Sequence, residues 1–284
     1  MRAFAAIAML AGCDRLFDVA PLAVVDGESG SGGDARARCA LGTPTIPNAG
    51  FGANTLSYTT NATNVAGFAE VAGVTNGFSY LPAGKQPTSN VLLVDPSHSL
   101  HYPRMSPEAD EVFLQSTPNA GGPPTIRRYT TPDAWMTWGD TTLSIDSQTA
   151  VAASFIPGVP TSRDASAQRH MLVDLGGGTF AELVETAVDQ WITRRMYTSL
   201  SLGIGGVVEL PALTADGLRA VFLVNASTFA IATASRQTID DPLVTERPVW
   251  LVAPNGVTMP FLSADCTTLY FSDASFEVFA APVR

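Results

Sequence analysis

Acidic residues recur at similar places along the chain and are the first candidates for chemistry. Four of them lie about fifty residues apart: Glu108, Asp164, Asp216 and Asp265. Each follows a hydroxyl residue by two positions: Ser106, Ser162, Thr214 and Ser263. Carboxylates that converge in one cleft can hydrolyse a glycoside. Because these acids occupy equivalent places in a repeated pattern, we instead expect them to bond backbone N–H groups in turns.

Two other stretches have the residue types of a binding site. Leu172–Phe180 contains Asp-Leu-Gly-Gly-Gly-Thr and resembles the phosphate loop of actin-like and Hsp70-type ATPases, but no partner loop or adenosine motif accompanies it. We expect a glycine-rich hairpin there. His98 and His101 precede a proline in a predicted strand, where side chains three residues apart point to opposite faces. We therefore predict no metal site, no cofactor and no catalytic residue.

The elements that position these residues are short strands. The stretch Glu209–Val224 is followed by a second apolar run, Phe229–Thr233. Met259–Ser272 has the same order of proline, hydroxyl, aspartate and apolar residues, and is followed by Glu277–Ala281. Each stretch predicts a small antiparallel sheet, and such a sheet must stack on neighbours to bury its faces.

Weaker copies of the pattern occupy residues 101–114, 159–173 and 46–58. Together, the copies resemble the WD-repeat-like propeller repeats of the TolB type, over about residues 40–284. The resemblance implies an all-β fold, a single β-propeller of four-stranded blades around a central channel. The spacing predicts five blades, with six shorter blades as the alternative. The resemblance brings no catalytic residue with it.

The N-terminus predicts export. Residues 1–12 have one arginine followed by apolar and small residues, as in a signal peptide, and Leu10-Ala-Gly-Cys13 resembles a bacterial lipobox. Cys13 is the predicted lipidation site, residues 13–38 the predicted flexible linker, and residues 39–284 the propeller domain. The alternative is a buried apolar segment with an incidental cysteine. The prediction places the protein in the cell envelope, membrane-anchored and facing the periplasm or the cell surface.

The two other cysteines, Cys39 and Cys266, lie near the ends of the predicted propeller. The resemblance implies that an N-terminal strand pairs with the final blade, which would bring these two residues together. We expect either a disulfide between them or two separate buried thiols.

Composition limits the function. The 284 residues carry 16 Lys and Arg against 26 Asp and Glu, for a net charge of −10, which argues against a nucleic-acid partner. Lys85 is the only lysine. We expect a non-enzymatic module that binds an envelope protein or a glycan. The alternatives are a five-bladed glycoside hydrolase with channel carboxylates and a purely structural envelope protein.

Overall fold

The structure is a computed structural model, and it describes twelve stretches of the chain: residues 48–52, 55–58, 64–71, 74–82, 93–108, 110–130, 139–146, 154–163, 168–252, 258–262, 268–272 and 277–282. The chain divides into two units, Met1–Gly33 and Asp34–Arg284, and all described residues lie in the second. These residues form strands and turns. No helix long and apolar enough to cross a membrane is found among them.

In these stretches, twenty-one strands form five sheets. Sheet 1 contains β2 (Thr55–Tyr58), β3 (Asn64–Val71), β4 (Val74–Pro82) and β5 (Leu93–Val94). Sheet 2 contains β6 (His98–Met105), β7 (Glu111–Pro118), β8 (Thr125–Thr130) and β9 (Gly139–Thr142). Sheet 3 contains β11 (Ile156–Pro157), β12 (His170–Gly176), β13 (Thr179–Ala187), β14 (Gln190–Thr198) and β10 (Ser144–Ile145).

Sheet 4 contains β15 (Val207–Leu213), β16 (Arg219–Asn225), β17 (Phe229–Ser235) and β18 (Val244–Val252). Sheet 5 contains β19 (Thr258–Leu262), β20 (Thr268–Ser272), β21 (Glu277–Pro282) and β1 (Asn48–Gly52). Neighbouring strands are antiparallel, except that β10 runs parallel to β14. The glycine-rich stretch forms the β12–β13 hairpin, as expected, with Gly177 and Gly178 at positive φ.

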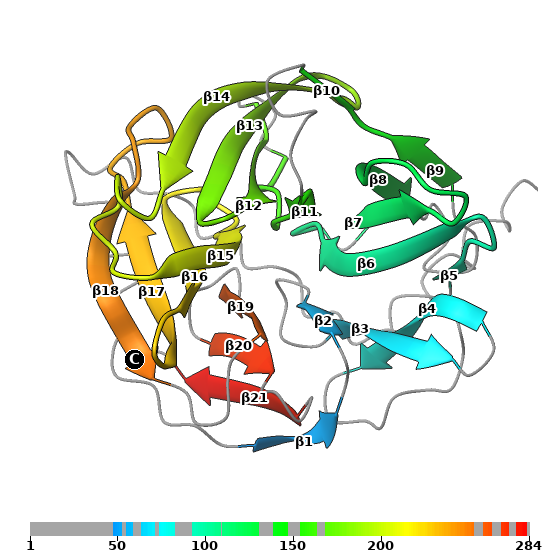
Figure 1. Cartoon of the computed structure of the whole chain (residues 1–284), viewed down its shortest axis with the longest axis horizontal. Coiled ribbons are helices and arrows are strands. Elements are labelled where there is room, and N and C mark those ends of the chain that lie inside the picture. The colour runs from blue at the N-terminus through cyan, green and yellow to red at the C-terminus, as the bar shows by residue number, and fades with distance from the viewer. Residues whose placement is uncertain are drawn as a thin grey trace, which may run out of the picture. The chain divides into compact units, whose positions relative to one another are not determined.

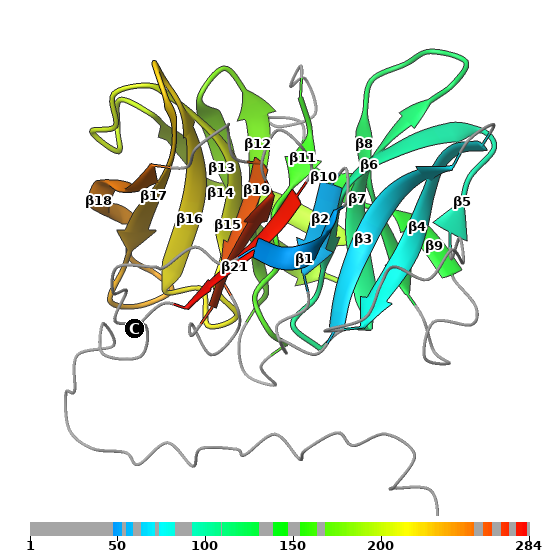
Figure 2. The ribbon, with the colours of Figure 1, turned by 90° about the horizontal axis from the view of Figure 1, so that it is seen from below.

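The five sheets stand around a common centre, with β2, β6, β11, β15 and β19 as the innermost strands (Figure 1). Figure 2, which is turned by 90° from Figure 1, shows the sheets standing next to one another. Strand β1 completes the last sheet by pairing with β21, with Asn48 opposite Phe279. Residues 48–52 therefore belong to sheet 5. The weak repeat copy at 46–58 thus divides between two sheets, since only Thr55–Tyr58 is an inner strand.

The core lies between adjacent sheets. Between sheets 2 and 3, Phe113 meets Trp191 edge to face, with ring centroids 6.3 Å apart. Between sheets 3 and 4, Phe180 packs on Phe222 at 5.3 Å. Because both faces of a sheet are covered in this way, a central strand such as β16 is a nearly continuous run of apolar residues.

The repeated proline follows a backbone irregularity. Tyr102 and Leu210 have φ values of 51° and 50°, and each lies where the pairing of its inner strand shifts register. The next residues are Pro103 and Pro211. A proline fits beside such a bulge, because the bulge interrupts the ladder and removes the need for an N–H donor.

The turn after each inner strand has the same hydrogen bonds in three sheets. The hydroxyl oxygens of Ser106, Thr161 and Thr214 accept the backbone N–H groups of Glu111, His170 and Arg219, at 3.2, 2.9 and 3.1 Å. In sheet 3 this hydroxyl belongs to Thr161, next to the predicted Ser162. Ser162 was predicted because it lies two residues before an acidic residue. That spacing does not mark the bonding hydroxyl in sheet 3, because the connection from Thr161 to His170 is longer than the corresponding connections in sheets 2 and 4.

Because Thr161 and not Ser162 accepts the His170 N–H, substitutions at these two positions should lower the stability of the fold by unequal amounts. Thr161→Val leaves the buried His170 amide without its acceptor and should lower the free energy of unfolding by about 1–3 kcal/mol. Ser162→Ala should change it by less than about 0.5 kcal/mol, because the Ser162 backbone N–H, which donates to Ala215, is retained. Urea denaturation followed by circular dichroism measures both. A larger loss of unfolding free energy for Ser162→Ala than for Thr161→Val would contradict the assignment of this hydrogen bond to Thr161.

Candidate functional site

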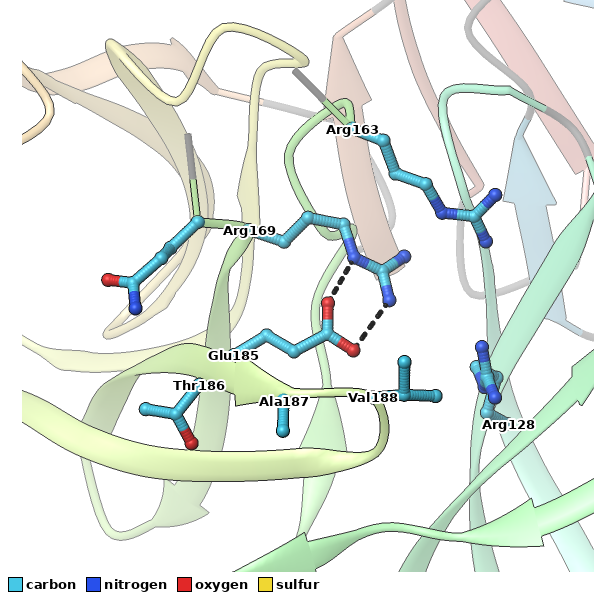
Figure 3. Close-up of a pocket in the computed structure, with 8 residues that line it drawn as sticks. Arg128, Arg163, Arg169, Glu185, Thr186, Ala187 and Val188 are labelled. Carbon is cyan, nitrogen blue, oxygen red and sulfur yellow. Dashed lines mark hydrogen bonds and ion pairs between the residues drawn. The ribbon is translucent and has the colours of Figure 1, made fainter. Parts of the chain in front are cut away.

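A pocket opens between sheets 2 and 3 and is rich in arginine. Its volume is about 440 Å³, and its lining includes Arg128, Arg163, Arg169 and Glu185. The β13–β14 hairpin, Thr186–Val188, forms one edge (Figure 3). Arg128 comes from β8 and Glu185 from β13, whereas Arg163 and Arg169 lie in the connection between β11 and β12, with Arg169 directly before β12.

The three guanidinium groups converge on one carboxylate, that of Glu111 at the start of β7. Glu111 is 1% exposed. Its oxygens lie 2.6 Å from Arg128 Nη1 and 2.5 Å from Arg169 Nη1, and it also pairs with Arg163 Nη2. A buried carboxylate is stable only with such partners, so this contact joins sheet 2 to the β11–β12 connection of sheet 3.

Arg169 is the most enclosed cation of the pocket. Its Nε and Nη2 donate to the two oxygens of Glu185 at 2.6 and 3.0 Å. Its guanidinium carbon lies 5.6 Å from the ring centres of both Phe113 and Trp191. Burial alone would lower the pKa of Arg169, but the hydrogen bonds that it donates to Glu185 and the charge of Glu111 raise its pKa, so the side chain stays charged.

The other two arginines of the pocket each form an ion pair with an aspartate at its edge. Arg128 Nη2 lies 2.7 Å from Asp189, and Arg163 Nη1 lies 2.9 Å from Asp110. The side chains of Arg163 and Asp110 are 44% and 43% exposed, whereas that of Arg128 is 13% exposed. Arg163 is therefore the cation that a ligand reaches most easily.

A second ion network joins sheets 3 and 4. Glu182, which is fully buried, lies 2.6 Å from Arg236 Nη1 and 2.7 Å from His170 Nδ1. Tyr197 donates its hydroxyl to the same carboxylate at 3.2 Å. Burial alone would raise the pKa of Glu182, but the hydrogen bond from His170 and the charge of Arg236 outweigh it and hold the pKa at about 2.

Two acids lie beside the inner strands. Asp174 accepts the N–H groups of Gly176 and Leu210 at 2.7 and 2.8 Å, so both of its oxygens are used by the backbone. Burial raises the pKa of Asp174. Burial and then the charge of Asp174 raise the pKa of Glu209, and burial with both charges raises that of Tyr102. These three groups are therefore close enough to interact.

The predicted turn residues differ in their bonds. Asp216 accepts both the Thr214 hydroxyl at 2.6 Å and the Leu218 N–H at 3.0 Å, within its own turn. The Ser106 hydroxyl bonds Asp110, whereas Glu108 accepts the N–H of Arg163 from the neighbouring sheet at 2.7 Å. The other predicted residues lie outside the described stretches: Cys13, Cys39, Asp164, Ser263, Asp265 and Cys266.

His98 and the loop acid Asp240 each lie beside an oppositely charged partner. His98 Nδ1 lies 3.0 Å from Asp95, which also pairs with Arg127 at 2.7 Å. Asp240 pairs with Arg194. Among the residues that the structure describes, no group of three or more His, Cys, Asp and Glu side chains is placed to hold a metal ion.

Sequence reasoning missed the arginine pocket and the Glu182 network. Glu111, His170 and Arg219 occupy the same place in three repeats, the first residue of the second strand, and all are buried. The signal that could have found these networks in the sequence is a charged or polar residue at the start of an apolar strand. The sequence could not reveal its partners, because they come from different repeats.

Comparisons with known proteins show the fold. No protein-family model and no curated protein matches this chain. The GH62 alpha-L-arabinofuranosidase catalytic domain from Coprinopsis cinerea is 9% identical over 86% of this chain and 98% of that one, with a TM-score of 0.57. The GH43 endo-arabinanase from Bacillus licheniformis is 13% identical over 86% and 94%, with a TM-score of 0.51.

TolB from Acinetobacter baumannii is 12% identical over 85% of this chain, with a TM-score of 0.47. This chain covers 55% of that one and so spans about half its length. Together, the sheet arrangement and the two glycosidase likenesses define an all-β protein with a β-propeller fold, and identities this low show nothing beyond the fold.

The Glu182 network predicts a pH-dependent loss of stability. Because the folded-state pKa of about 2 lies below the usual value of 4.5, the carboxylate stabilises the fold above pH 4.5 and loses this effect as the pH falls toward 2. Glu182→Gln leaves the buried Arg236 unpaired and should cost on the order of 3–5 kcal/mol at pH 7.

The stability difference between the wild type and Glu182→Gln should therefore shrink as the pH falls from 5 to 2. Urea denaturation at each pH measures this difference. Asp240→Asn is a suitable control, since it removes one carboxylate from an exposed pair of the neighbouring loop. A difference that stays constant from pH 7 to pH 2 would show that Glu182 is not the titrating group.

Proposed function

We propose that this chain is a cell-envelope lipoprotein whose single five-bladed β-propeller binds a protein or a glycan without catalysing a reaction. This proposal rests on the contacts made by the buried carboxylates. Glu111 and Glu182 are surrounded by arginines, and both oxygens of Asp174 accept backbone N–H groups. Carboxylates held in this way stabilise the fold and are poorly suited to proton transfer.

The arginine pocket is the proposed binding site. It lies between two sheets, is open to solvent, and has the exposed Arg163 and Val188 at its edges. Concave sites at the junction of rigid elements are common places for ligands. The proposed count of five blades is supported by the five sheets of the described stretches.

Photo-crosslinking in intact bacterial cells tests binding at the pocket. A photoreactive amino acid replaces Val188, which is 73% exposed at the pocket edge. The control has the same replacement at Leu200, which is 89% exposed in the loop between β14 and β15. We expect a discrete adduct from position 188 and none from position 200. Equal labelling at both positions, or none at 188, would count against a binding site here.

The proposed lipid anchor on Cys13 predicts a change in membrane association. Cys13→Ser should abolish incorporation of radiolabelled palmitate and release the protein from the membrane fraction, because the acyl chains provide the anchor. Cys39→Ser is the matched control and should keep both the label and the membrane association. Palmitate incorporation that persists in Cys13→Ser would refute the assignment.

A glycoside hydrolase is the second candidate, and one observation favours it. Glu209 is partly buried on an inner strand, and burial with the charge of Asp174 raises its pKa, as a general acid requires. The non-catalytic proposal predicts no hydrolysis of arabinan or of aryl arabinofuranosides by the purified protein. Turnover that is lost in Glu209→Gln, with an unchanged melting temperature, would establish the hydrolase instead.

A further inference from the structure

The two ends of sheets 3 and 4 differ in charge. Because successive strands alternate in direction, the connections between them lie alternately at one end and at the other. At the end where β15 begins, no charged residue occurs in the described connections, which are 177–178, 199–206 and 226–228. We call this the uncharged end. The described connections of the opposite end contain one buried arginine and four aspartates: Arg236, Asp189, Asp216, Asp240 and Asp241.

Exposed apolar side chains gather at the uncharged end. Their exposed fractions are 89% for Leu200, 56% for Val252, 39% for Phe229 and 37% for Val207. Val207 in β15 and Phe229 in β17 both lie directly opposite Asn225 in β16, and so occupy one row across the sheet. Val252 pairs with Ala230, the residue after Phe229. Neighbouring exposed apolar side chains of this kind mark a surface that contacts a partner or a membrane.

The β14–β15 loop fixes the position of Leu200. The Thr198 N–H donates to Ser201 Oγ at 2.9 Å, and the Ser201 N–H donates to Thr198 Oγ1 at 3.0 Å. Leu202 and Ile204 are 6% and 5% exposed and belong to the core cluster between sheets 3 and 4. The loop therefore buries two of its three large apolar side chains and holds the third, Leu200, in solvent. Because the loop is already ordered, a contact at Leu200 costs little conformational entropy.

We propose that the uncharged end faces the membrane that holds the lipid anchor, and that Leu200 and Phe229 enter the lipid interface. This inference rests on the proposed anchor at Cys13 and adds the orientation of the propeller. An acyl anchor keeps a domain at a membrane without deciding which side faces the lipid. A surface with anionic lipids repels acidic groups, and this chain carries a net charge of −10. The repulsion is smallest when the uncharged end faces the lipid and the aspartates of the opposite end face away.

A lipid surface fits this end better than a protein or a glycan does. Leu200 and Phe229 are of the residue types that interfacial segments bury between headgroups and acyl chains. The other residues of the three connections are small, apart from the buried Leu202 and Ile204, and none of them brings a charge that must be desolvated. A glycan site offers aromatic rings on which sugars stack, and Phe229 is the only aromatic among the four exposed apolar residues.

Quenching of fluorescence by brominated lipid tests the orientation. The lipidated protein is reconstituted into vesicles of equal parts phosphatidylcholine and phosphatidylglycerol, with or without bromine on the acyl chains. A fluorescent amino acid replaces Leu200 in one variant and Val188 in another. Val188 is the matched control, because it is 73% exposed in a connection of the opposite end. Brominated lipid should strongly reduce the emission from position 200 and leave the emission from position 188 unchanged.

A charge placed at the same position supplies a second test. With the fluorescent residue at position 229, Leu200→Glu should restore the emission in brominated vesicles, because a carboxylate is costly to bring into an anionic lipid interface. Val188→Glu should leave the quenching at position 229 unchanged. Melting temperatures establish that both variants are folded.

Several results would overturn the inference. They are equal quenching at positions 200 and 188, no quenching at position 200 in protein that floats with the vesicles, and unchanged quenching at position 229 in Leu200→Glu. A discrete protein adduct from a photoreactive residue at position 200 would assign this end to a protein partner instead. If the wild-type protein does not float with the vesicles, the proposed anchor fails and this inference fails with it. The cellular adduct at position 188 tests the arginine pocket separately, whichever end faces the membrane.

Discussion

The structure depends on one constraint: no single sheet can bury its own faces. In sheets 2, 3 and 4, strands β7, β12 and β16 have runs of consecutive buried residues, so both faces of each of these sheets need a covering neighbour. Contacts such as Phe113 with Trp191 and Phe180 with Phe222 meet this requirement between successive sheets. The pairing of β1 with β21 places residues from both ends of the described chain in one sheet, and thus supplies the last sheet with its outer strand.

The same constraint explains the buried ion networks. Where two sheets meet near the turns that follow the inner strands, charged side chains lie beside polar backbone groups, and Glu111 and Glu182 are almost fully buried there. Each of these two acids is paired with several donors, and arginine suits this role because one side chain reaches several acceptors. The fold uses these two acids, whereas the Arg163 side chain is 44% exposed and Glu209 lies partly buried on the inner strand β15.

Local structure followed closely from the sequence. The apolar runs at 220–224, 229–233, 268–271 and 277–281 all lie within strands of the structure, and the glycine-rich stretch forms a hairpin. Both patterns depend on residues that are near one another in the chain. The repeat was harder to place where its connections change length: Thr161 holds the place predicted for Ser162, and residues 46–58 contribute to two sheets.

The sequence by itself determined the glycine-rich hairpin and two strand pairs, 220–224 with 229–233 and 268–271 with 277–281, because hydrophobic period and turn residues act over a few positions. It also led us to expect that Asp216 bonds the backbone of its turn, where Asp216 accepts the Leu218 N–H. The arginine pocket was decided only by the tertiary structure. Arg128, Arg163 and Glu111 come from separate segments, and their partnership depends on how sheets 2 and 3 meet. No local sequence pattern specifies these contacts, because the distance between the sheets and the burial of these side chains arise only once the repeats have stacked.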